Sequence, residues 1–366
     1  MFRVTRILLK AHPAPTVNPV ATAKVINSAT SASPDSFHIP IINFEPFFSG
    51  SRLSKETVAQ EVLSGFVNSG FIYLKGWEKV LSKDVVNTTF EESARFFARP
   101  TEEKAELQWM TPESNRGYVT AGRERVSRLA SVDEIEKLKK ANPDIKESME
   151  IGKEMPADTP KEFTNRWPKD DEQFKSTMTN FFEKCHALHL EVLSSIALGL
   201  GLEPRWFDQH CDAKDHNLRL LHYPSVKKDQ ISANKSNRAG AHTDYGTITL
   251  LFQDSAGGLE VLSPTGQYIA APPIPGTIVV NAGDLLARWS NDKIMSTEHR
   301  VVAPASSPDN DVYPARYSIA FFANPNYETE IEALEGTFRN GKEKKYERIN
   351  TLDYLVQRLT ATYGKK

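Results

Sequence analysis

The chain has 366 residues, of which 39% are hydrophobic and 25% are charged, and these fractions are typical of a soluble globular protein. Its 45 basic and 47 acidic residues leave a net charge of −2, which provides no long-range field to attract nucleic acid or an anionic membrane. The longest apolar run that we find, residues 196–202, is much shorter than the roughly 20 residues of a transmembrane helix. We therefore expect a small-molecule partner, no nucleic acid and no membrane, and we leave the oligomeric state open.

Residues 1–36 differ in composition from the rest of the chain. Four basic residues precede the first acidic residue, Asp35, among many prolines, alanines, serines and threonines. Such an acid-poor, arginine-containing start is typical of an organellar transit peptide, but a disordered tail without a targeting role can have the same composition. We expect a cytoplasmic protein with a disordered tail, or a mitochondrial one if this segment acts as a transit peptide.

Residues 37–168 alternate short apolar runs with amphipathic helical patterns, which predicts a mixed region of helices and strands. Residues 115–169 are rich in proline, glycine and charge, and we expect mostly loops there. The predicted strands are residues 38–44 and 71–76, and the predicted helices are residues 54–69, 82–98 and 132–140.

A long helix is predicted between residues 171 and 200, within a region that spans residues 169–212. Its apolar residues, among them Phe174, Phe181 and Leu188, recur at helical spacing over the whole length. We expect this helix to be a spine that packs against a large surface.

After Pro204 the apolar residues occur in short runs that glycine and proline separate, a pattern typical of a β-sandwich or barrel. We expect a jelly roll, or double-stranded β-helix, over residues 213–330, followed by a helical C-terminal extension over residues 331–366. The fold class is then α+β with a mainly β core, a helical N-terminal region and the spine helix. The predicted strands are residues 218–223, 247–252, 259–262, 277–281, 299–302 and 316–323.

Two cysteines, Cys185 and Cys211, are too few for a disulfide framework or a cysteine-rich metal site, so any metal must be held by histidine and carboxylate. His242 and Asp244 are two residues apart, and on an extended backbone their side chains leave the same face. His299 begins an apolar run and can return beside them across a closed sheet. Two imidazoles and one carboxylate form the facial triad of non-haem Fe(II) oxygenases, although an H-x-D pair alone is weak support for a metal site. The other histidines of this half are expected at the surface or in packing: His210, His216 and His222.

The segments around these residues resemble the iron(II)- and 2-oxoglutarate-dependent dioxygenase superfamily, in the branch that includes isopenicillin N synthase and the plant flavonoid and gibberellin oxygenases. The resemblance rests on HTDYGTITLLFQ, VNAGDLLARWSN, EHRVV, RYS and LRLLHYP, and on IPIINF, SGFIYLKG and NRGYVTAG nearer the N-terminus. It implies an oxidoreductase that uses Fe(II), O₂ and 2-oxoglutarate, with ascorbate as an additional reductant. Such an enzyme hydroxylates or otherwise oxidises a small organic molecule and produces succinate and CO₂.

The resemblance also implies roles for particular residues. The H-x-D pair and the distal histidine match the iron ligands, and no side chain need act as a general acid or base. Arg316 and Ser318 match an R-x-S pair that holds the distal carboxylate of 2-oxoglutarate, and the planar fork of a guanidinium suits that role. Tyr223 matches a tyrosine that reaches the co-substrate or the substrate, with a buried packing role as the alternative. Leu221 stands where plant relatives often have asparagine, so one polar contact near the iron is absent or is supplied by another residue.

The substrate itself cannot be predicted from the sequence. Arg123 belongs to a group of four arginines within residues 116–128, which either receives an acidic substrate or forms a solvated loop. The residues that we expect around the substrate are Tyr118, Tyr245, Leu251, Phe321 and Arg123.

Two alternative functions remain at this point. An iron oxidase of the same fold would work without 2-oxoglutarate, as isopenicillin N synthase does, and would be recognised by turnover in its absence. A catalytically silent β-barrel that binds a ligand is less well supported, because the chain has a complete set of candidate iron ligands.

Overall fold

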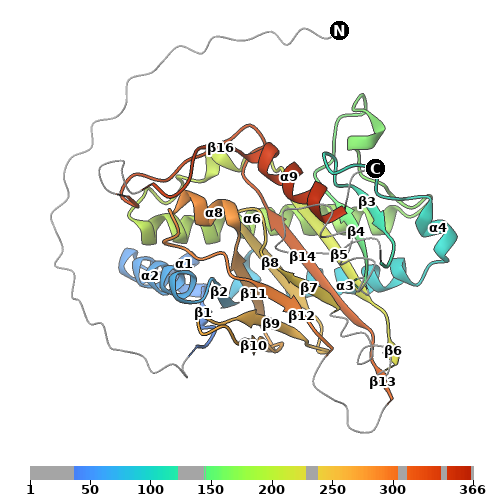
Figure 1. Cartoon of the computed structure of the whole chain (residues 1–366), viewed down its shortest axis with the longest axis horizontal. Coiled ribbons are helices and arrows are strands. Elements are labelled where there is room, and N and C mark those ends of the chain that lie inside the picture. Colours follow the sequence, from blue (N-terminus) through green and yellow to red (C-terminus); the bar gives the residue numbers. More distant parts are fainter. Residues whose placement is uncertain are drawn as a thin grey trace. The chain divides into compact units, whose positions relative to one another are not determined.

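The computed structural model describes residues 37–122, 144, 146–227, 238–303, 311–338 and 344–363 (Figure 1). The possible transit segment, the helix predicted at residues 132–140 and Arg123 lie outside these ranges. Within them, no helix combines the length and the apolar character that crossing a membrane requires.

Two sheets form the core of the compact unit Phe37–Lys366. The large sheet has the order β1-β2-β11-β8-β14-β5-β4-β3, and the small sheet has the order β10-β9-β12-β7. The strands of the large sheet are β1 (Ile41–Asn43), β2 (Phe71–Lys75), β3 (Gly117–Val119), β4 (Glu147–Ile151), β5 (Asn217–Tyr223), β8 (Ile248–Gln253), β11 (Thr277–Ala282) and β14 (Arg316–Ala323). Those of the small sheet are β7 (Ala239–His242), β9 (Leu259–Leu262), β10 (Tyr268–Ala270) and β12 (His299–Val301).

Apolar side chains from both sheets meet in a shared interior, which confirms the predicted jelly roll. Tyr73, Val279 and Ala320 of the large sheet belong to one buried cluster with Val261 and Val301 of the small sheet. Two short ribbons extend the structure: β6 (Val226–Lys227) pairs with β13 (Val312–Tyr313), and β15 (Glu330–Ile331) pairs with β16 (Ile349–Asn350).

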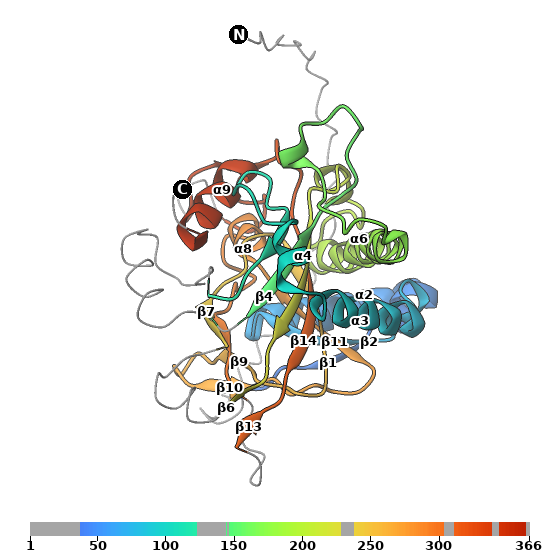
Figure 2. The same cartoon turned by 90° about the vertical axis from the view of Figure 1, so that its right-hand side faces the viewer.

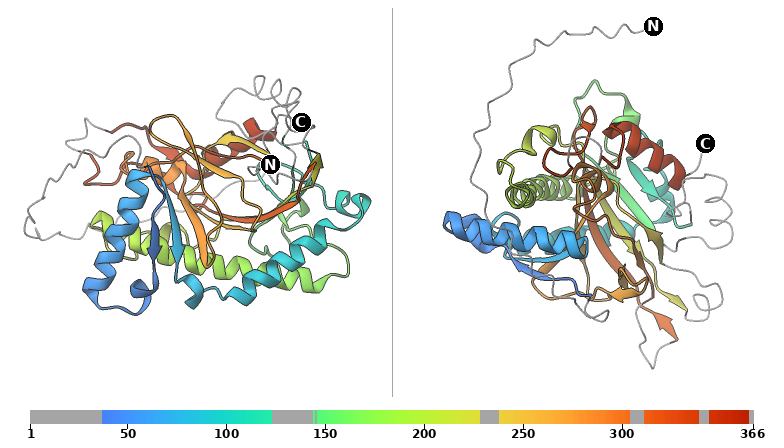
Figure 3. Two further views of the ribbon diagram at one scale, coloured as in Figure 1. Left: turned by 90° about the horizontal axis from the view of Figure 1, so that it is seen from below. Right: turned by 60° about the vertical axis from the view of Figure 1, so that its left-hand side comes forward.

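A layer of helices covers the other face of the large sheet (Figures 2 and 3). The spine helix α6 (Glu172–Leu200) agrees with its prediction and packs beside α2 (Arg52–Asn68) and α3 (Lys83–Phe97). Helix α2 begins earlier than predicted, because Ser51 rather than Ser54 caps it by accepting a hydrogen bond from the Ser54 amide. The other helices in the described ranges are α1 (Glu45–Ser49), α4 (Thr101–Ala105), α8 (Asp284–Trp289) and α9 (Thr351–Tyr363), with short 3₁₀ turns at Trp77–Lys79, Lys161–Phe163 and Asp208–His210.

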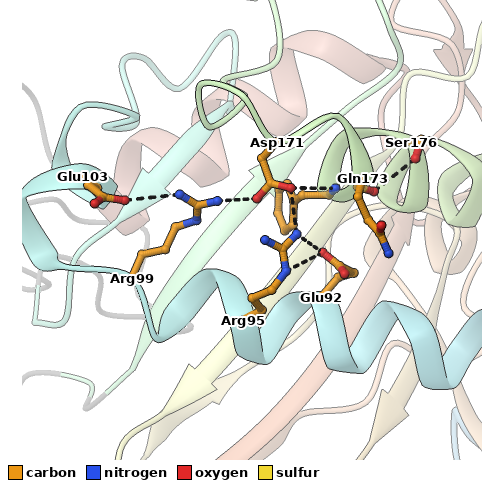
Figure 4. A network of polar contacts seen from close by, with 8 residues as sticks. Glu92, Arg95, Arg99, Glu103, Asp171, Gln173 and Ser176 are labelled. Atoms are coloured by element: carbon orange, nitrogen blue, oxygen red, sulfur yellow. Dashed lines mark hydrogen bonds and ion pairs between the residues drawn. The ribbon is translucent and has the colours of Figure 1, made fainter.

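Asp171 joins the start of the spine helix to α3 (Figure 4). Its carboxylate caps α6 by accepting a hydrogen bond of 3.1 Å from the Phe174 amide, and it also pairs with Arg95, at 2.7 Å, and Arg99. Helix N-termini favour such a carboxylate because their free amide groups carry partial positive charge. One residue therefore ties together the two helices that support the end of the sheet.

Strand β14 shows how the fold separates the barrel interior from the helix layer. Alternate residues of a strand leave opposite faces. Ala320 and Phe322 pack in the barrel interior, whereas Ile319 and Phe321 belong to the core between the large sheet and the helices. Arg316 and Ser318, at the same alternation as Ala320, therefore face the interior.

Candidate active site

Three side chains that are far apart in the sequence converge at one end of the small sheet. His242 ends β7, Asp244 follows two residues later, and His299 begins β12 directly opposite His242 in the pairing of the two strands. Their ligand atoms all lie within 4.8 Å of one another, and Asp244 Oδ1 lies 3.8 Å from His242 Nε2 and 3.7 Å from His299 Nε2. Bonds of about 2 Å from each atom to one ion would span such separations.

Both histidines have a hydrogen bond that directs the other ring nitrogen to the centre of the triad. The Nδ1 of His242 donates to the Gly240 carbonyl at 2.8 Å, and the Nδ1 of His299 donates to the Thr297 carbonyl at 3.1 Å. When either imidazole is in its neutral form, its Nε2 atom therefore carries a lone pair, as a metal ligand requires.

The carboxylate of Asp244 is oriented in the same way. Its Oδ2 accepts hydrogen bonds from Thr249 Oγ1 at 2.6 Å and from Asn281 Nδ2 at 2.7 Å, which leaves Oδ1 directed towards the histidines. Burial opposes ionisation of Asp244, but the imidazoles of His299 and His242, with these two hydrogen bonds, hold its pKa below the usual value. Burial also lowers the pKa of His242 to about 3, so its imidazole is neutral at physiological pH. This donor set suits Fe(II).

Arg316 and Ser318 lie together in the barrel interior, each with a side chain that is almost fully buried. Arg316 Nη1 donates to Ser318 Oγ at 2.9 Å, and its Cζ lies 4.9 Å from the ring centroid of Tyr223 on the adjacent strand β5. Because Ser318 Oγ accepts this bond, its own hydroxyl hydrogen can be donated to another group. The Nε of Arg316 has no hydrogen-bond acceptor among the described residues. A buried donor without an acceptor fits a site for an anionic ligand, such as a carboxylate.

A pocket opens beside the triad and is lined by His242 and Asp244. Tyr245, one of the residues that we expect around the substrate, also lines it, and its polar lining includes Asn217 and Arg219, which were not anticipated. Both lie on β5, whose sequence predicts only an apolar strand. Glu150, fully buried on β4, orients them by accepting hydrogen bonds from Asn217 Nδ2 at 2.7 Å and Arg219 Nε at 2.9 Å.

Three of the residues expected around the substrate, Tyr118, Leu251 and Phe321, do not line this pocket. Phe321 packs against Phe182 in the helix layer, with ring centroids 5.3 Å apart, and it is Phe322 that lines the pocket. Tyr118 is buried near Phe96 and donates a hydrogen bond to Glu147. Leu251 packs at the edge of the barrel-interior cluster and is not part of the pocket wall.

Helix α9 closes one side of the pocket through Leu352, Leu355, Val356 and Leu359. The helix lies at the end of the sheets opposite β6 and β13 (Figures 1 and 2). Hydrogen bonds tie this helix to residues beside the triad. Tyr354 donates at 2.7 Å to Asp284, whose amide donates to the Asp244 carbonyl, and the hydroxyls of Tyr245 and Thr362 are 2.8 Å apart.

A second cluster of histidines, His186, His189 and His216, lies between α6 and the large sheet. The Nδ1 of His216 accepts a hydrogen bond from the Asn324 amide, so its Nε2 carries the proton and donates to His186 Nδ1 at 2.9 Å. This tautomer leaves His216 without a lone pair directed at the other two rings. We conclude that the cluster is a structural hydrogen-bonded chain, in agreement with the packing role expected for His216.

The chain matches two family models. One, described as "2OG-Fe(II) oxygenase superfamily", covers residues 214–325, and the other, described as "non-haem dioxygenase in morphine synthesis N-terminal", covers residues 39–170. The 2-oxoglutarate-Fe(II) type oxidoreductase ppzD of Metarhizium rileyi is 34% identical to this chain, over 88% of this chain and 91% of that protein.

Two crystal structures of one full-length protein from Neurospora crassa are also similar. Its complex with alpha-KG and thymine shows 53% identity and a TM-score of 0.81, and covers 90% of this chain and 98% of that chain. Its complex with alpha-KG and 5-formyluracil shows 50% identity and a TM-score of 0.79 over the same fractions. This chain therefore belongs to the iron(II)- and 2-oxoglutarate-dependent dioxygenase superfamily, as an oxidoreductase that uses Fe(II), O₂ and 2-oxoglutarate to oxidise a small organic molecule.

Proposed function

We propose that this dioxygenase oxidises the methyl group of thymine, taken as the free base. In this proposal the triad of His242, Asp244 and His299 holds Fe(II), and Arg316 and Ser318 hold the distal carboxylate of 2-oxoglutarate. Tyr223 packs against Arg316 and restricts its orientation.

The similarity to the Neurospora crassa protein carries the proposal. That protein was crystallised with thymine and with 5-formyluracil, and these two bases differ only in whether the carbon on C5 is a methyl or an aldehyde group. An enzyme that inserts oxygen into C–H bonds of that carbon connects one base to the other. Identity of 53% over nearly all of both chains makes a shared substrate class the simplest expectation.

The pocket beside the triad has the chemistry that a pyrimidine base needs. Thymine is flat and neutral, and its edge carries two N–H donors and two carbonyl acceptors. Phe322 and Tyr245 supply aromatic surface, and Asn217 and Arg219 supply polar groups within the same pocket. Arg219 Cζ lies 5.3 Å from the Phe322 ring centroid, so polar and aromatic groups are neighbours there.

The protein's part in the reaction is to bind, orient and exclude water. Bound iron and 2-oxoglutarate supply the oxidising power for a C–H bond. Glu150 keeps Asn217 and Arg219 in place, and α9 covers the pocket, so the methyl group is presented to the triad in one orientation.

Product analysis tests the proposal. Purified protein is incubated with Fe(II), ascorbate, 2-oxoglutarate and thymine, and we expect 5-hydroxymethyluracil, succinate and CO₂ in equal amounts in the first turnover. Uracil is the matched control because it lacks the methyl group and should give no hydroxylated product. Thymidine tests whether the base must be free. Succinate formation that thymine does not stimulate, or product formation without 2-oxoglutarate, would contradict the proposal.

A further inference from the structure

Arg238 is a fully buried arginine that the sequence patterns did not single out. It comes directly before β7, four residues before His242, and its relative exposure is 0%. Its Nη2 donates to the Pro314 carbonyl at 2.7 Å, but its Nε and Nη1 have no acceptor among the described residues. Burying a guanidinium without satisfying its donors is costly unless an anion pairs with it.

Arg316 lies close to this side chain. Pro314, which accepts the hydrogen bond from Arg238, is two residues before Arg316 in the chain, and Arg316 has its own unsatisfied Nε. Burial, together with the positive charge of Arg316, lowers the pKa of Arg238 below its usual value. The two cations therefore repel each other in a buried environment. Within the described part of the chain their hydrogen bonds go to Pro314, Ser318 and Gln253, none of which offers a carboxylate.

A neighbouring carboxylate offsets this repulsion only in part, because it forms no hydrogen bond to either guanidinium within the described residues. Asp254 acts on Arg238 through space, but its oxygens accept hydrogen bonds from the Tyr317 and Ala256 amides, at 2.5 and 2.9 Å. A carboxylate has two oxygens, so one carboxylate can accept hydrogen bonds from the free N–H groups of both guanidiniums.

We propose that Arg238 is a second guanidinium that binds the distal carboxylate of 2-oxoglutarate, together with Arg316 and Ser318. This inference rests on the co-substrate site proposed above. It makes Arg238 a residue that selects a dianionic 2-oxo acid over a monoanionic one, because only the dianion has a carboxylate at the end that faces both arginines.

The test compares two ligands of equal length. 2-Oxopentanoate has the same five-carbon chain as 2-oxoglutarate but ends in a methyl group. Full-length protein loaded with Fe(II) without oxygen is titrated with each ligand, and the charge-transfer absorption that forms on chelation reports binding without any turnover. For R238Q we expect the Kd of 2-oxoglutarate to rise about tenfold or more, which corresponds to roughly 1.4 kcal/mol. The Kd of 2-oxopentanoate should stay within about twofold of the wild-type value, because that ligand makes no distal ion pair.

Three further variants make the outcome decisive. R238K keeps the charge but loses the planar fork, so it should weaken 2-oxoglutarate binding less than R238Q; if R238Q does not fold, the selective effect in R238K takes its place. R95Q, in the distant network of α3 and α6, removes another arginine and should change neither Kd.

R316Q tests the co-substrate site itself. Unchanged 2-oxoglutarate binding in R316Q overturns that site, whereas loss of binding in R316Q but not in R238Q overturns only the inference on Arg238. Equal weakening of both ligands in R238Q would show a merely structural role.

Discussion

At the scale of single residues, hydrogen bonds determine which atoms of the triad face the metal. Gly240 and Thr297 orient the two imidazoles, and Thr249 and Asn281 hold one oxygen of Asp244. Partners of this kind typically change metal affinity by about 10- to 100-fold when they are removed. These hydrogen bonds therefore orient all three side chains of the triad.

Replacement of Thr249 by valine tests this orienting role. Valine has nearly the same shape but cannot donate the 2.6 Å hydrogen bond to Asp244, so we expect the Kd for Fe(II) or Co(II) to rise about tenfold. Metal titration of the apoprotein measures the change. Thr277→Val is the control, because its hydroxyl donates to the Ile274 carbonyl outside the triad. Equal metal affinities in the two variants would show that the hydrogen bond does not orient the ligand.

At the scale of elements, β5 and α9 line the pocket that we propose for the substrate, and β7 and β12 carry the two histidines of the triad. The pocket shares His242 and Asp244 with the triad, but its wall on the α9 side contributes no metal ligand. Changes in α9 should alter substrate binding without altering metal or co-substrate binding.

Leu355→Trp tests this separation, because Leu355 lines the pocket from α9. The larger side chain should fill the pocket and raise the KM for thymine about tenfold or more, a loss of roughly 1.4 kcal/mol of binding. Iron and 2-oxoglutarate affinities should remain as in the wild type. Gln357→Trp places the same side chain on the exposed side of this helix and should have little effect on the KM. If both variants impair thymine oxidation equally, α9 does not shape the pocket.

At the scale of the whole molecule, buried histidines link stability to pH. Burial, with a smaller effect of His186, lowers the pKa of His189 to about 3, and burial with neighbouring positive groups places the pKa of His216 well below its usual value. Both are neutral in the folded protein, whereas in the unfolded chain they take up protons below a pH of about 6.5. The unfolded state therefore binds more protons as the pH falls, and stability decreases from about pH 6.5 downwards, by up to about 1.4 kcal/mol per pH unit for each histidine.

Urea denaturation of the metal-free protein at pH 7 and pH 5.5 measures this dependence. We expect a lower free energy of unfolding at pH 5.5, and a smaller difference between the two conditions in His189→Gln, which removes one of these groups. A pH dependence that the substitution leaves unchanged would show that His189 does not contribute.

The sequence by itself determined the features that depend on local pattern. Periodicity of apolar residues predicted the spine helix and the strands, because these patterns reflect contacts with a single surface. The H-x-D pair, His299 and the R-x-S pair were recognisable because their spacing and chemistry are carried within short segments.

Only the tertiary structure decided which face of a strand meets the pocket and which distant groups become partners. Phe322 rather than Phe321 lines the pocket because a shift of one residue reverses the face of a strand. Arg238 and Arg316 are 78 positions apart and become neighbours only when the barrel closes. Asn217 and Arg219 look like ordinary polar residues until Glu150 of the adjacent strand orients them beside the triad. Such pairings depend on strand order and register, which no local pattern in a single sequence specifies.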